Sequence, residues 1–331
     1  MKKIIFLILN EKIRSCGIHD FSLILSAKLC KNKNFRTKNI HLSNWSILSF
    51  IKIKSKISDN DILFINYPNK SMGSYLGIFF LNFIFIKNKI YFFLHEFNSF
   101  NIIRKILFYF LIFKNYFLFS NQSEKSMFKK FFIFKNVITS FVVPIPSNIP
   151  KLNFKFNSNN RSGILYFGLI SKKKIIFEDV KLFILKFRKL SSYRISIIGS
   201  ITDYNNSEKE ELKKFLSLNN VDFFESIGVS ELSKLLLTHK IAYLPYEEGA
   251  SEKNATLIAC IEHGLNVFTT YSDKTSKLIK QITNQIYDHN KTIKQIDQAI
   301  LSNKLQNITL REKFISAHSW DNTISQLVKI I

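Results

Sequence analysis

The segment LPYEEGASEKNATLIACIEHGLNVFTT, residues 244–270, contains two apolar strands that are joined through a helix. The first strand ends at Pro245, and a polar loop carrying Gly249 follows it. Apolar residues then recur at helical spacing from near Thr256, and the segment closes with the apolar run LNVFTT. Two buried strands connected by a helix are the repeating unit of a parallel α/β sheet.

Other apolar runs of this kind occur along the chain in two series, separated by stretches with helical patterning. Continuous apolar strands that alternate with helices indicate parallel sheets covered on both faces. The sequence therefore predicts an α/β protein with two doubly wound, Rossmann-like domains. The first series is IIFLIL (4–9), DILFINYP (61–68), KIYFFLHE (89–96) and YFLFSN (116–121), and the second is GILYFGLI (163–170), YRISIIGS (193–200), VDFFES (221–226), IAYLPY (241–246) and LNVFTT (265–270).

A boundary between the two series is visible in the composition. The proline-rich stretch PIPSNIP (144–150) is followed by the polar stretch KFNSNNRSG (155–163). We therefore predict an N-terminal domain over residues 1–150 and a C-terminal domain over residues 151–315. The last residues, 316–331, contain an amphipathic helix with apolar residues at helical spacing: Trp320, Ile324, Leu327 and Ile330.

The charge of the chain is distributed unevenly. The 331 residues include 48 Lys and Arg against 24 Asp and Glu, a net charge of +24. Residues 1–150 hold 22 of these basic residues, 6 of the acidic ones and 23 of the 34 Phe. A/T-rich coding bias would act on both halves alike, so the asymmetry indicates a basic, aromatic N-terminal half that suits anionic lipid headgroups. Nucleic acid would accept such a surface too, but no nucleic-acid-binding module is recognisable and we predict no nucleic-acid partner.

The cysteines and apolar tracts indicate the compartment. Cys16, Cys30 and Cys260 have no paired spacing, which predicts reduced thiols in the cytoplasm. Apolar tracts at 76–94 and 102–120 are interrupted by Lys or Asn before the ~20 residues that a membrane span needs. We predict no transmembrane helix and a peripheral position at the inner face of the cell membrane.

The N-terminal run MKKIIFLILN resembles a signal peptide only briefly, because Asn10-Glu11-Lys12 ends it without a small-residue cleavage site. We interpret this run as a buried first strand.

Candidate ligand-binding residues follow the predicted strands, because ligands bind beyond the carboxyl ends of the strands in open α/β sheets. Within the 247–256 loop, the small residues Gly249, Ala250 and Ser251 would let backbone amides approach an anion, and Lys253 adds a positive charge. This pattern fits a diphosphate site, and it fits an ordinary strand-to-helix turn equally well. Outside this loop the candidates are Gly17, His95, Lys172 to Lys174 and Gly199.

The same segment resembles the donor loop of family 4 glycosyltransferases, in particular the bacterial branch in which it reads roughly D-G-x-S-x-R-R-G-S-L-L-A-A-L-A-H-G-L-P-V. Weaker similarities to that family occur around Gly17 (SCGIHDFSLILSAKL), around His95 (HEFNSFNIIRK), in PIPSNIP and in YFGLISKKKIIFEDVKLF. The matching residues of the donor loop are Glu248, Gly249, Ser251, Lys253, Thr256, Leu257, Ala259, His263, Gly264, Leu265 and Val267.

The resemblance implies a GT-B fold, in which two Rossmann-like domains face each other across a cleft and the C-terminal helix packs back on the N-terminal domain. It implies that a nucleotide-diphosphate sugar binds the C-terminal domain as donor substrate, with no cofactor and no metal, and that the N-terminal domain holds the acceptor. The residues it indicates are His95 and Lys174 for catalysis, Gly249, Ala250, Ser251, Lys253, Lys172 and Gly17 for the diphosphate, and Gly199, Glu248 and Thr256 for the nucleotide or sugar.

The chain also departs from the family pattern. Most members carry two Glu residues at the positions of Ser251 and Ala259, an Arg at the position of Leu169 and a Gly at that of Ile175. These departures favour one alternative, a catalytically degenerate GT-B protein that binds saccharide only. A basic nucleic-acid-binding protein is the less favoured alternative.

The resemblance and the composition together predict a glycosyltransferase of bacterial surface polysaccharide synthesis. It would transfer a sugar, with retention at the anomeric carbon, to a saccharide acceptor that is linked to lipid. One edge of the segment 102–120, with Arg104, Lys105 and Lys114, is expected to rest in the lipid interface.

Two further motifs are predicted to be structural. Asp59 and Asp61 match the D-x-D pattern of metal-binding glycosyltransferases but precede a strand, so we interpret them as solvated carboxylates. His263 is expected to be buried in the turn after the donor-loop helix.

Overall fold

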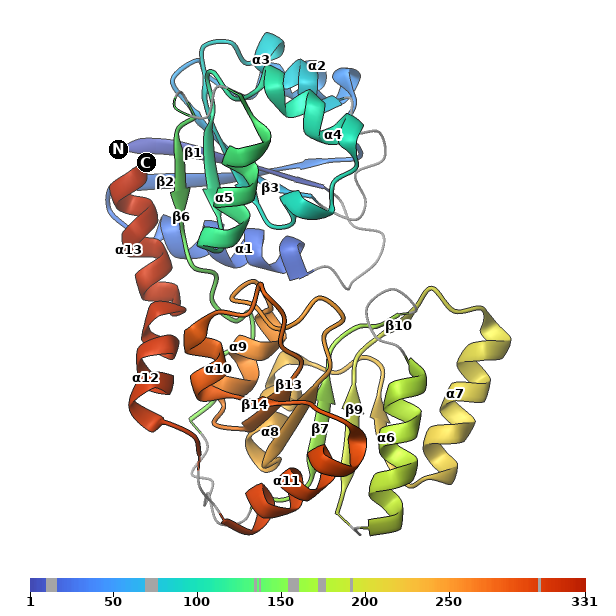
Figure 1. Ribbon diagram of the computed structural model, residues 1–331. Coiled ribbons are helices and arrows are strands. Elements are labelled where there is room, and N and C mark those ends of the chain that lie inside the picture. The colour runs from blue at the N-terminus through green and yellow to red at the C-terminus, as the bar shows by residue number, and fades with distance from the viewer. Residues whose placement is uncertain are drawn as a thin grey trace. The chain divides into compact units, whose positions relative to one another are not determined.

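A computed structural model describes residues 1–9, 17–68, 77–133, 136, 138–153, 161–171, 177–190, 193–302 and 305–331. The chain forms two compact units, each with its own parallel sheet (Figure 1). Unit 1 comprises Met1–Asn148 together with Trp320–Ile331, and unit 2 comprises Ile149–Ser319. The α/β class and the two doubly wound units that the sequence predicts are confirmed.

The sheet of unit 1 has six parallel strands in the order β2-β1-β3-β4-β5-β6. The chain first builds outward from β1 to β2 and then crosses back to β3, so the topological switch point lies between β1 and β3. The strands are β1 (Lys2–Leu9), β2 (Phe35–Leu42), β3 (Ile62–Tyr67), β4 (Lys89–Leu94), β5 (Tyr116–Phe119) and β6 (Ser140–Val142). The helices are α1 (Gly17–Cys30), α2 (Ile47–Lys54), α3 (Gly77–Ile84), α4 (Ile102–Leu107) and α5 (Gln122–Phe131), with short 3₁₀ turns η1 (Phe97–Ser99) and η2 (Phe108–Phe110).

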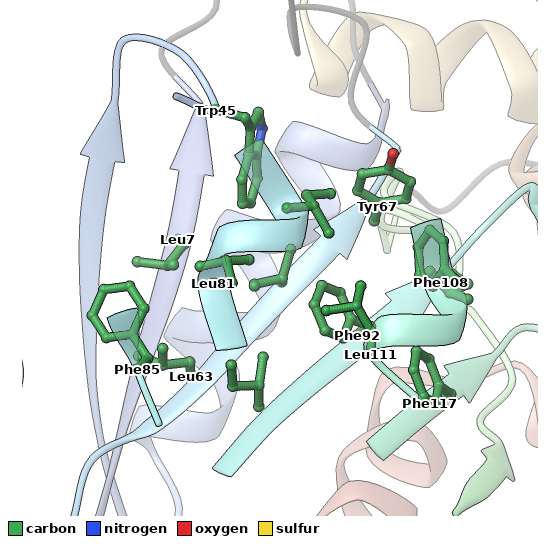
Figure 2. Close-up of a cluster of buried hydrophobic side chains, with 14 of the residues drawn as sticks. Leu7, Trp45, Leu63, Tyr67, Leu81, Phe85, Phe92, Phe108, Leu111 and Phe117 are labelled. Atoms are coloured by element: carbon green, nitrogen blue, oxygen red, sulfur yellow. The ribbon is translucent and has the colours of Figure 1, made fainter. Parts of the chain in front are cut away.

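Aromatic side chains pack with Leu and Ile in the core between this sheet, helices α2, α3 and α5, and the 3₁₀ turns (Figure 2). Phe92 and Phe117, on neighbouring strands, stack with ring centroids 5.8 Å apart, and Phe108 meets the ring of Phe92 edge-on. Only three Phe of the described part of unit 1 are largely exposed, namely Phe83, Phe110 and Phe113. The excess of Phe in this half of the chain is therefore mainly a property of its core.

The sheet of unit 2 also has six parallel strands, in the order β11-β9-β7-β12-β13-β14. Its switch point lies between β7 and β12, which pair directly. The strands are β7 (Ile164–Phe167), β9 (Ile195–Ile198), β11 (Val221–Phe224), β12 (Ile241–Leu244), β13 (Asn266–Thr269) and β14 (Asn284–Gln285), beside a small sheet of β8 (Ile170–Ser171) and β10 (Ile201–Thr202). The helices are α6 (Phe177–Leu190), α7 (Asn206–Leu218), α8 (Val229–Thr238), α9 (Ala255–Glu262), α10 (Lys277–Ile282), α11 (His289–Ser302) and α12 (Ile308–Ala317).

The last helix, α13 (Trp320–Ile330), packs on unit 1, as the sequence predicts. The Trp320 indole stacks on Phe21 of α1 with centroids 5.4 Å apart, and its Nε1 donates to the Ser147 carbonyl at 3.0 Å. The Thr323 hydroxyl donates to the Pro144 carbonyl at 2.7 Å, and Leu327 is fully buried. The chain terminus thus completes the face of the unit 1 sheet that α1 covers.

No helix in the described part of the chain is both long enough and apolar enough to span a membrane.

Replacing Leu327 by Ala is expected to lower the free energy of unfolding of unit 1 by about 2–5 kcal/mol, because the substitution leaves a cavity where α13 packs. Ser325→Ala, on the exposed face of the same helix, should change it by about 0.5 kcal/mol or less. Both tryptophans of the chain, Trp45 and Trp320, belong to unit 1, so urea unfolding followed by tryptophan fluorescence measures this unit. Equal effects of the two substitutions would show that α13 is not part of the packed unit.

Candidate functional site

The carboxyl edge of the unit 2 sheet brings together three glycine-containing turns. Gly168 follows β7, Gly199 follows β9, and Gly249 lies in the loop after β12, all with positive φ. β7 lies between β9 and β12, so these turns are neighbours at the switch point of the sheet. This is the edge at which ligands bind in open α/β sheets.

Gly199 is required by the packing of this edge. A Cβ at this position would lie 1.8 Å from the Gly168 carbonyl oxygen, and its φ is +153°. The Gly168 amide donates to the Ile198 carbonyl, and the Gly199 amide donates to the Phe224 carbonyl, both at 3.0 Å. Gly199 lets its own turn and the Gly168 turn approach closely. It therefore has a role in packing, in addition to the predicted role in nucleotide binding.

The predicted diphosphate loop is folded on itself. The amide of Gly249 donates to the Tyr246 carbonyl at 3.1 Å, and that of Ala250 donates to the Thr270 carbonyl at 2.9 Å. The Ser251 amide donates to Asn254 Oδ1 at 2.7 Å, and both Ala250 and Ser251 are buried. In this conformation each of the three amides already has an acceptor, and their contact with a diphosphate stays a prediction.

The N-terminus of α9 is better placed for an anion. The first amides of a helix have no intrahelical partner, and the side chain of the N-cap residue Asn254 bonds Ser251 and not the helix. One of these amides, that of Leu257, donates to the Tyr246 hydroxyl. The hydroxyls of Tyr246 and Thr256 lie 2.6 Å apart at this helix end. Burial raises the pKa of Tyr246 well above its usual value, so this group remains a neutral hydroxyl. Tyr246 was not singled out in the sequence, because nothing local links it to the start of α9.

Two lysines and one carboxylate lie beside this loop. Glu248 Oε2 is 2.9 Å from Lys274 Nζ and 3.9 Å from Lys253 Nζ. The sequence predicts Lys253 and Glu248 as site residues but not Lys274, which comes from the turn after β13. The ion pairs are at least partly exposed, so they provide mobile charge more than stability.

The opposite end of α9 is held by arginines. Arg311 of α12 is 3% exposed and donates to the carbonyls of Ile261, Leu265 and Ile282 at 2.7–3.2 Å. Burial lowers the pKa of Arg311 to about 10, so the group is charged at neutral pH. Arg161 Nη1 donates to the His263 carbonyl at 2.8 Å. Cations at this end satisfy the last carbonyls of the helix and complement its dipole.

His263 is structural, as predicted. Its Nδ1 is 2.8 Å from the Ala259 carbonyl oxygen, and its Nε2 is 2.9 Å from the Ser233 hydroxyl. Burial lowers the pKa of His263 to about 4, so the ring is neutral. Ala259 is fully buried, which means that this position faces the core of unit 2.

In unit 1, His95 and Gly17 both lie at the carboxyl edge of the sheet. His95 directly follows β4, and its amide donates to the Tyr67 carbonyl at 2.9 Å. Burial lowers the pKa of the His95 ring to about 3, so it is neutral. Gly17 is the first residue of α1, and its carbonyl accepts a hydrogen bond from Asn148 Nδ2 at 2.8 Å.

The remaining predicted residues divide into two groups. Lys172 and Lys174, with Ile175, lie outside the residues that the structure describes. Asp61 is bonded to Lys3 at 2.7 Å, and Asp59 is 3.2 Å from Lys54. The interpretation of solvated carboxylates is correct for Asp59, which is exposed, and wrong for Asp61, which is buried against Lys3.

Two doubly wound units of this order in one chain correspond to the GT-B fold of glycosyltransferases. No protein-family model and no curated protein matches the chain by sequence. Its structure is similar to that of Anabaena HepE in complex with UDP and glucose, with a TM-score of 0.70 and 12% identity over 99% of this chain and 98% of the other.

Two further glycosyltransferase structures are similar over the full chain. Sucrose-phosphate synthase from Thermosynechococcus elongatus has a TM-score of 0.69 and 9% identity over 100% of this chain and 98% of the other. WaaG, a glycosyltransferase involved in lipopolysaccharide biosynthesis, has a TM-score of 0.62 and 11% identity over 99% and 98%. At these identities the similarity establishes the fold.

The substitution Gly199→Ala is expected to destabilise unit 2 by about 3 kcal/mol or more, because the new Cβ would collide with a backbone carbonyl. Gly228→Ala is the matched control, since a Cβ there has nothing within 4 Å and the cost should be about 1 kcal/mol or less. Differential scanning calorimetry of both variants measures the difference. Similar transition temperatures would mean that the Gly168 and Gly199 turns are not packed as described.

Proposed function

We propose that the chain is a glycosyltransferase that takes its sugar from a nucleotide-diphosphate sugar. The observation that carries the proposal is the full-length GT-B fold, in which the β12–α9 loop lies at the switch point of unit 2. Structures of Anabaena HepE contain UDP or UDP-glucose, which supports the same class of donor for this chain.

In this proposal the diphosphate binds at the N-terminus of α9. The helix dipole and the first amides attract the anion, while Lys253 and Lys274 neutralise the charge that develops on the leaving group. Lys172 and Lys174 are proposed to contribute further positive charge. Protein cations then take the role that a divalent metal has in other glycosyltransferases, and no metal or other cofactor is required.

The amides of Gly249 to Ser251 could join this site only if the loop opened. Opening would break three hydrogen bonds, and contacts with the nucleotide would have to compensate for them. The loop conformation therefore supports primary anion contacts at the N-terminus of α9 and not at the loop amides. Gly199, Glu248 and Thr256 are proposed to lie near the nucleotide or sugar, and Gly17 near the diphosphate.

For the acceptor we propose a lipid-linked saccharide of bacterial surface polysaccharide synthesis, with retention at the anomeric carbon and with His95 orienting the acceptor or the sugar. The family resemblance supports these assignments. The same setting would place the protein at the cytoplasmic face of the membrane.

A mixed apolar and basic surface on unit 1 supports the membrane part of this proposal. Helices α2, α3 and α4 lie together on unit 1 (Figure 1), and the rings of Phe79 and Phe110 connect α3 to η2 at 4.9 Å. Lys114 lies at this surface, where its Nζ donates to the Ile86 carbonyl. Helix α4 carries Arg104 and Lys105, and Lys105 donates to the Asn98 carbonyl at 3.2 Å. The apolar residues that are more than half exposed here are Leu48, Ile51, Phe83, Ile86, Ile102, Ile103, Phe110 and Phe113. Apolar residues beside cations suit insertion at an anionic lipid interface.

A saccharide-binding protein without transferase activity is the second candidate. The internal bonding of the donor loop and the burial of Ala259 favour it, because both reduce the polar groups available to a nucleotide.

Calorimetric titration with UDP, GDP, ADP, CMP and their sugar conjugates, without added metal, tests the nucleotide site. We expect micromolar binding of one nucleoside diphosphate, with Lys253→Ala and Lys274→Ala each weakening it about tenfold or more, since each removes a charge-assisted contact. Lys294→Ala, at an exposed position on α11, is the control and should bind normally. An absence of binding by every nucleotide would leave the saccharide-binding candidate as the better account.

Co-sedimentation with phosphatidylcholine vesicles, with and without phosphatidylglycerol, tests the membrane surface. We expect binding that requires the anionic lipid, decreases with salt, and falls about tenfold or more in Ile103→Ser/Phe113→Ser, because two apolar side chains are lost from the lipid contact. The matched control is Leu218→Ser/Leu301→Ser, which removes two highly exposed apolar side chains from unit 2. Equal losses in both variants, or no dependence on anionic lipid, would contradict the proposed surface.

A further inference from the structure

A buried chain of hydrogen bonds connects helix α1 to His95 inside unit 1. His95 Nε2 is 3.2 Å from Asn66 Oδ1, and Asn66 Nδ2 donates to the Ser22 hydroxyl at 2.8 Å. The Ser22 hydroxyl donates in turn to the Ile18 carbonyl, one helical turn earlier in α1, at 2.8 Å. His95, Asn66 and Ser22 are each at most 8% exposed.

The donor and acceptor roles in this series of hydrogen bonds are fixed by its last bond, from Ser22 to the Ile18 carbonyl. A backbone carbonyl can only accept, so the Ser22 hydroxyl uses its proton on Ile18 and must accept from the amide of Asn66. The carbonyl oxygen of Asn66 therefore faces His95. Because this oxygen can only accept, the proton of the neutral His95 ring lies on Nε2 and its Nδ1 carries a lone pair.

The ring of His95 is also held in orientation. It stacks on Phe93 with centroids 4.7 Å apart, and the ring of Phe21 meets it at 84° with centroids 5.5 Å apart. Burial keeps the ring neutral, as the lowered pKa of about 3 indicates. His95 lies where β4 ends, at the edge of the sheet where ligands bind.

We propose that Ser22 and Asn66 are positioning residues that hold His95 as its Nε2–H tautomer, so that Nδ1 is the hydrogen-bond acceptor it offers to a hydroxyl of the saccharide substrate. The tautomer follows from unit 1 alone, and the hydroxyl partner rests on the proposed function. A neutral ring without a proton on Nδ1 cannot donate there. His95 thus orients a hydroxyl group and does not act as a general acid through that nitrogen.

The tautomer can be measured directly by NMR of the full chain labelled with ¹⁵N-histidine, because protonated and unprotonated ring nitrogens differ widely in ¹⁵N shift. His95→Gln identifies the His95 signals among the 7 histidines. At pH 7 we expect the Nε2–H form in about tenfold excess or more, the effect of one retained hydrogen bond. A dominant Nδ1–H form would overturn the proposal, since it would require the Asn66 amide to be reversed.

Two variants of α1 separate the hydrogen-bond chain from general destabilisation. Ser22→Ala removes the group that fixes Asn66, so the Nδ1–H form should increase severalfold. Ser26→Ala removes a similarly buried hydroxyl one helical turn further along α1. This hydroxyl donates to Asn39 Oδ1 at 2.7 Å and is not part of the hydrogen bonds that join Ser22, Asn66 and His95. It should leave the tautomer unchanged. Equal ratios in Ser22→Ala and the wild type would also overturn the proposal.

The hydroxyl contact is tested by adding glucose and UDP-glucose while the Nδ1 signal is followed. A hydrogen bond to Nδ1 should shift this signal and leave that of Nε2 nearly unchanged. An unshifted Nδ1 signal with both ligands would overturn the role toward saccharide. Nucleotide binding in calorimetry decides the proposed function independently, and the tautomer of the free protein requires no ligand.

Discussion

The buried guanidinium of Arg311 is the interaction on which the candidate donor site depends. It donates to three carbonyl groups, those of Ile261 at the end of α9, Leu265 directly before β13, and Ile282 at the end of α10. Substituting it would leave these buried carbonyls without partners, at a cost of on the order of 1–3 kcal/mol for each group. Because no carboxylate takes part in these three bonds, the charge is balanced by the negative ends of two helices.

This fixation has a consequence at the other end of α9. Arg311 and Arg161 donate to carbonyl groups at the carboxyl end of α9 and so fix the position of this helix. Its N-terminus, the positive end of the helix dipole, is thereby held at the carboxyl edge of the sheet. Tyr246 and Thr256 meet there, and the cations of Lys253 and Lys274 lie beside the preceding loop. The architecture thus places the N-terminus of α9 beside Lys253 and Lys274, although both lysines pair with Glu248 and the amides of Gly249 to Ser251 are occupied.

The central strands of both sheets could be predicted from the sequence, but most of the edge strands could not. Strands such as β3 and β12 are buried along their length and appear as continuous apolar runs. β2, FRTKNIHL, lies at the edge of its sheet with several side chains exposed, and its mixed pattern was not recognised as a strand. The sequence does not predict β6 and β14, because strands of three and two residues are too short to form a recognisable apolar run.

The site residues divide in a similar way. Those that follow a strand directly, such as His95 and Gly199, could be located from the strand pattern alone. The strand pattern could not locate Tyr246, Lys274 or Arg311. Each of them contacts residues ten or more positions away in the sequence, and these contacts become visible only in the folded structure. The composition was misleading in one respect, since most of the Phe in the N-terminal half fill the core, and Ile contributes much of the exposed apolar surface.

A crystal structure of the protein soaked with UDP, the nucleotide present in the HepE crystals, is the most direct measurement. We predict that the diphosphate lies at the N-terminus of α9, within hydrogen-bonding distance of its first amides and within about 4 Å of the Nζ of Lys253 or Lys274. Diphosphate density elsewhere on the molecule, with this helix end unoccupied, would contradict the assignment of the donor site.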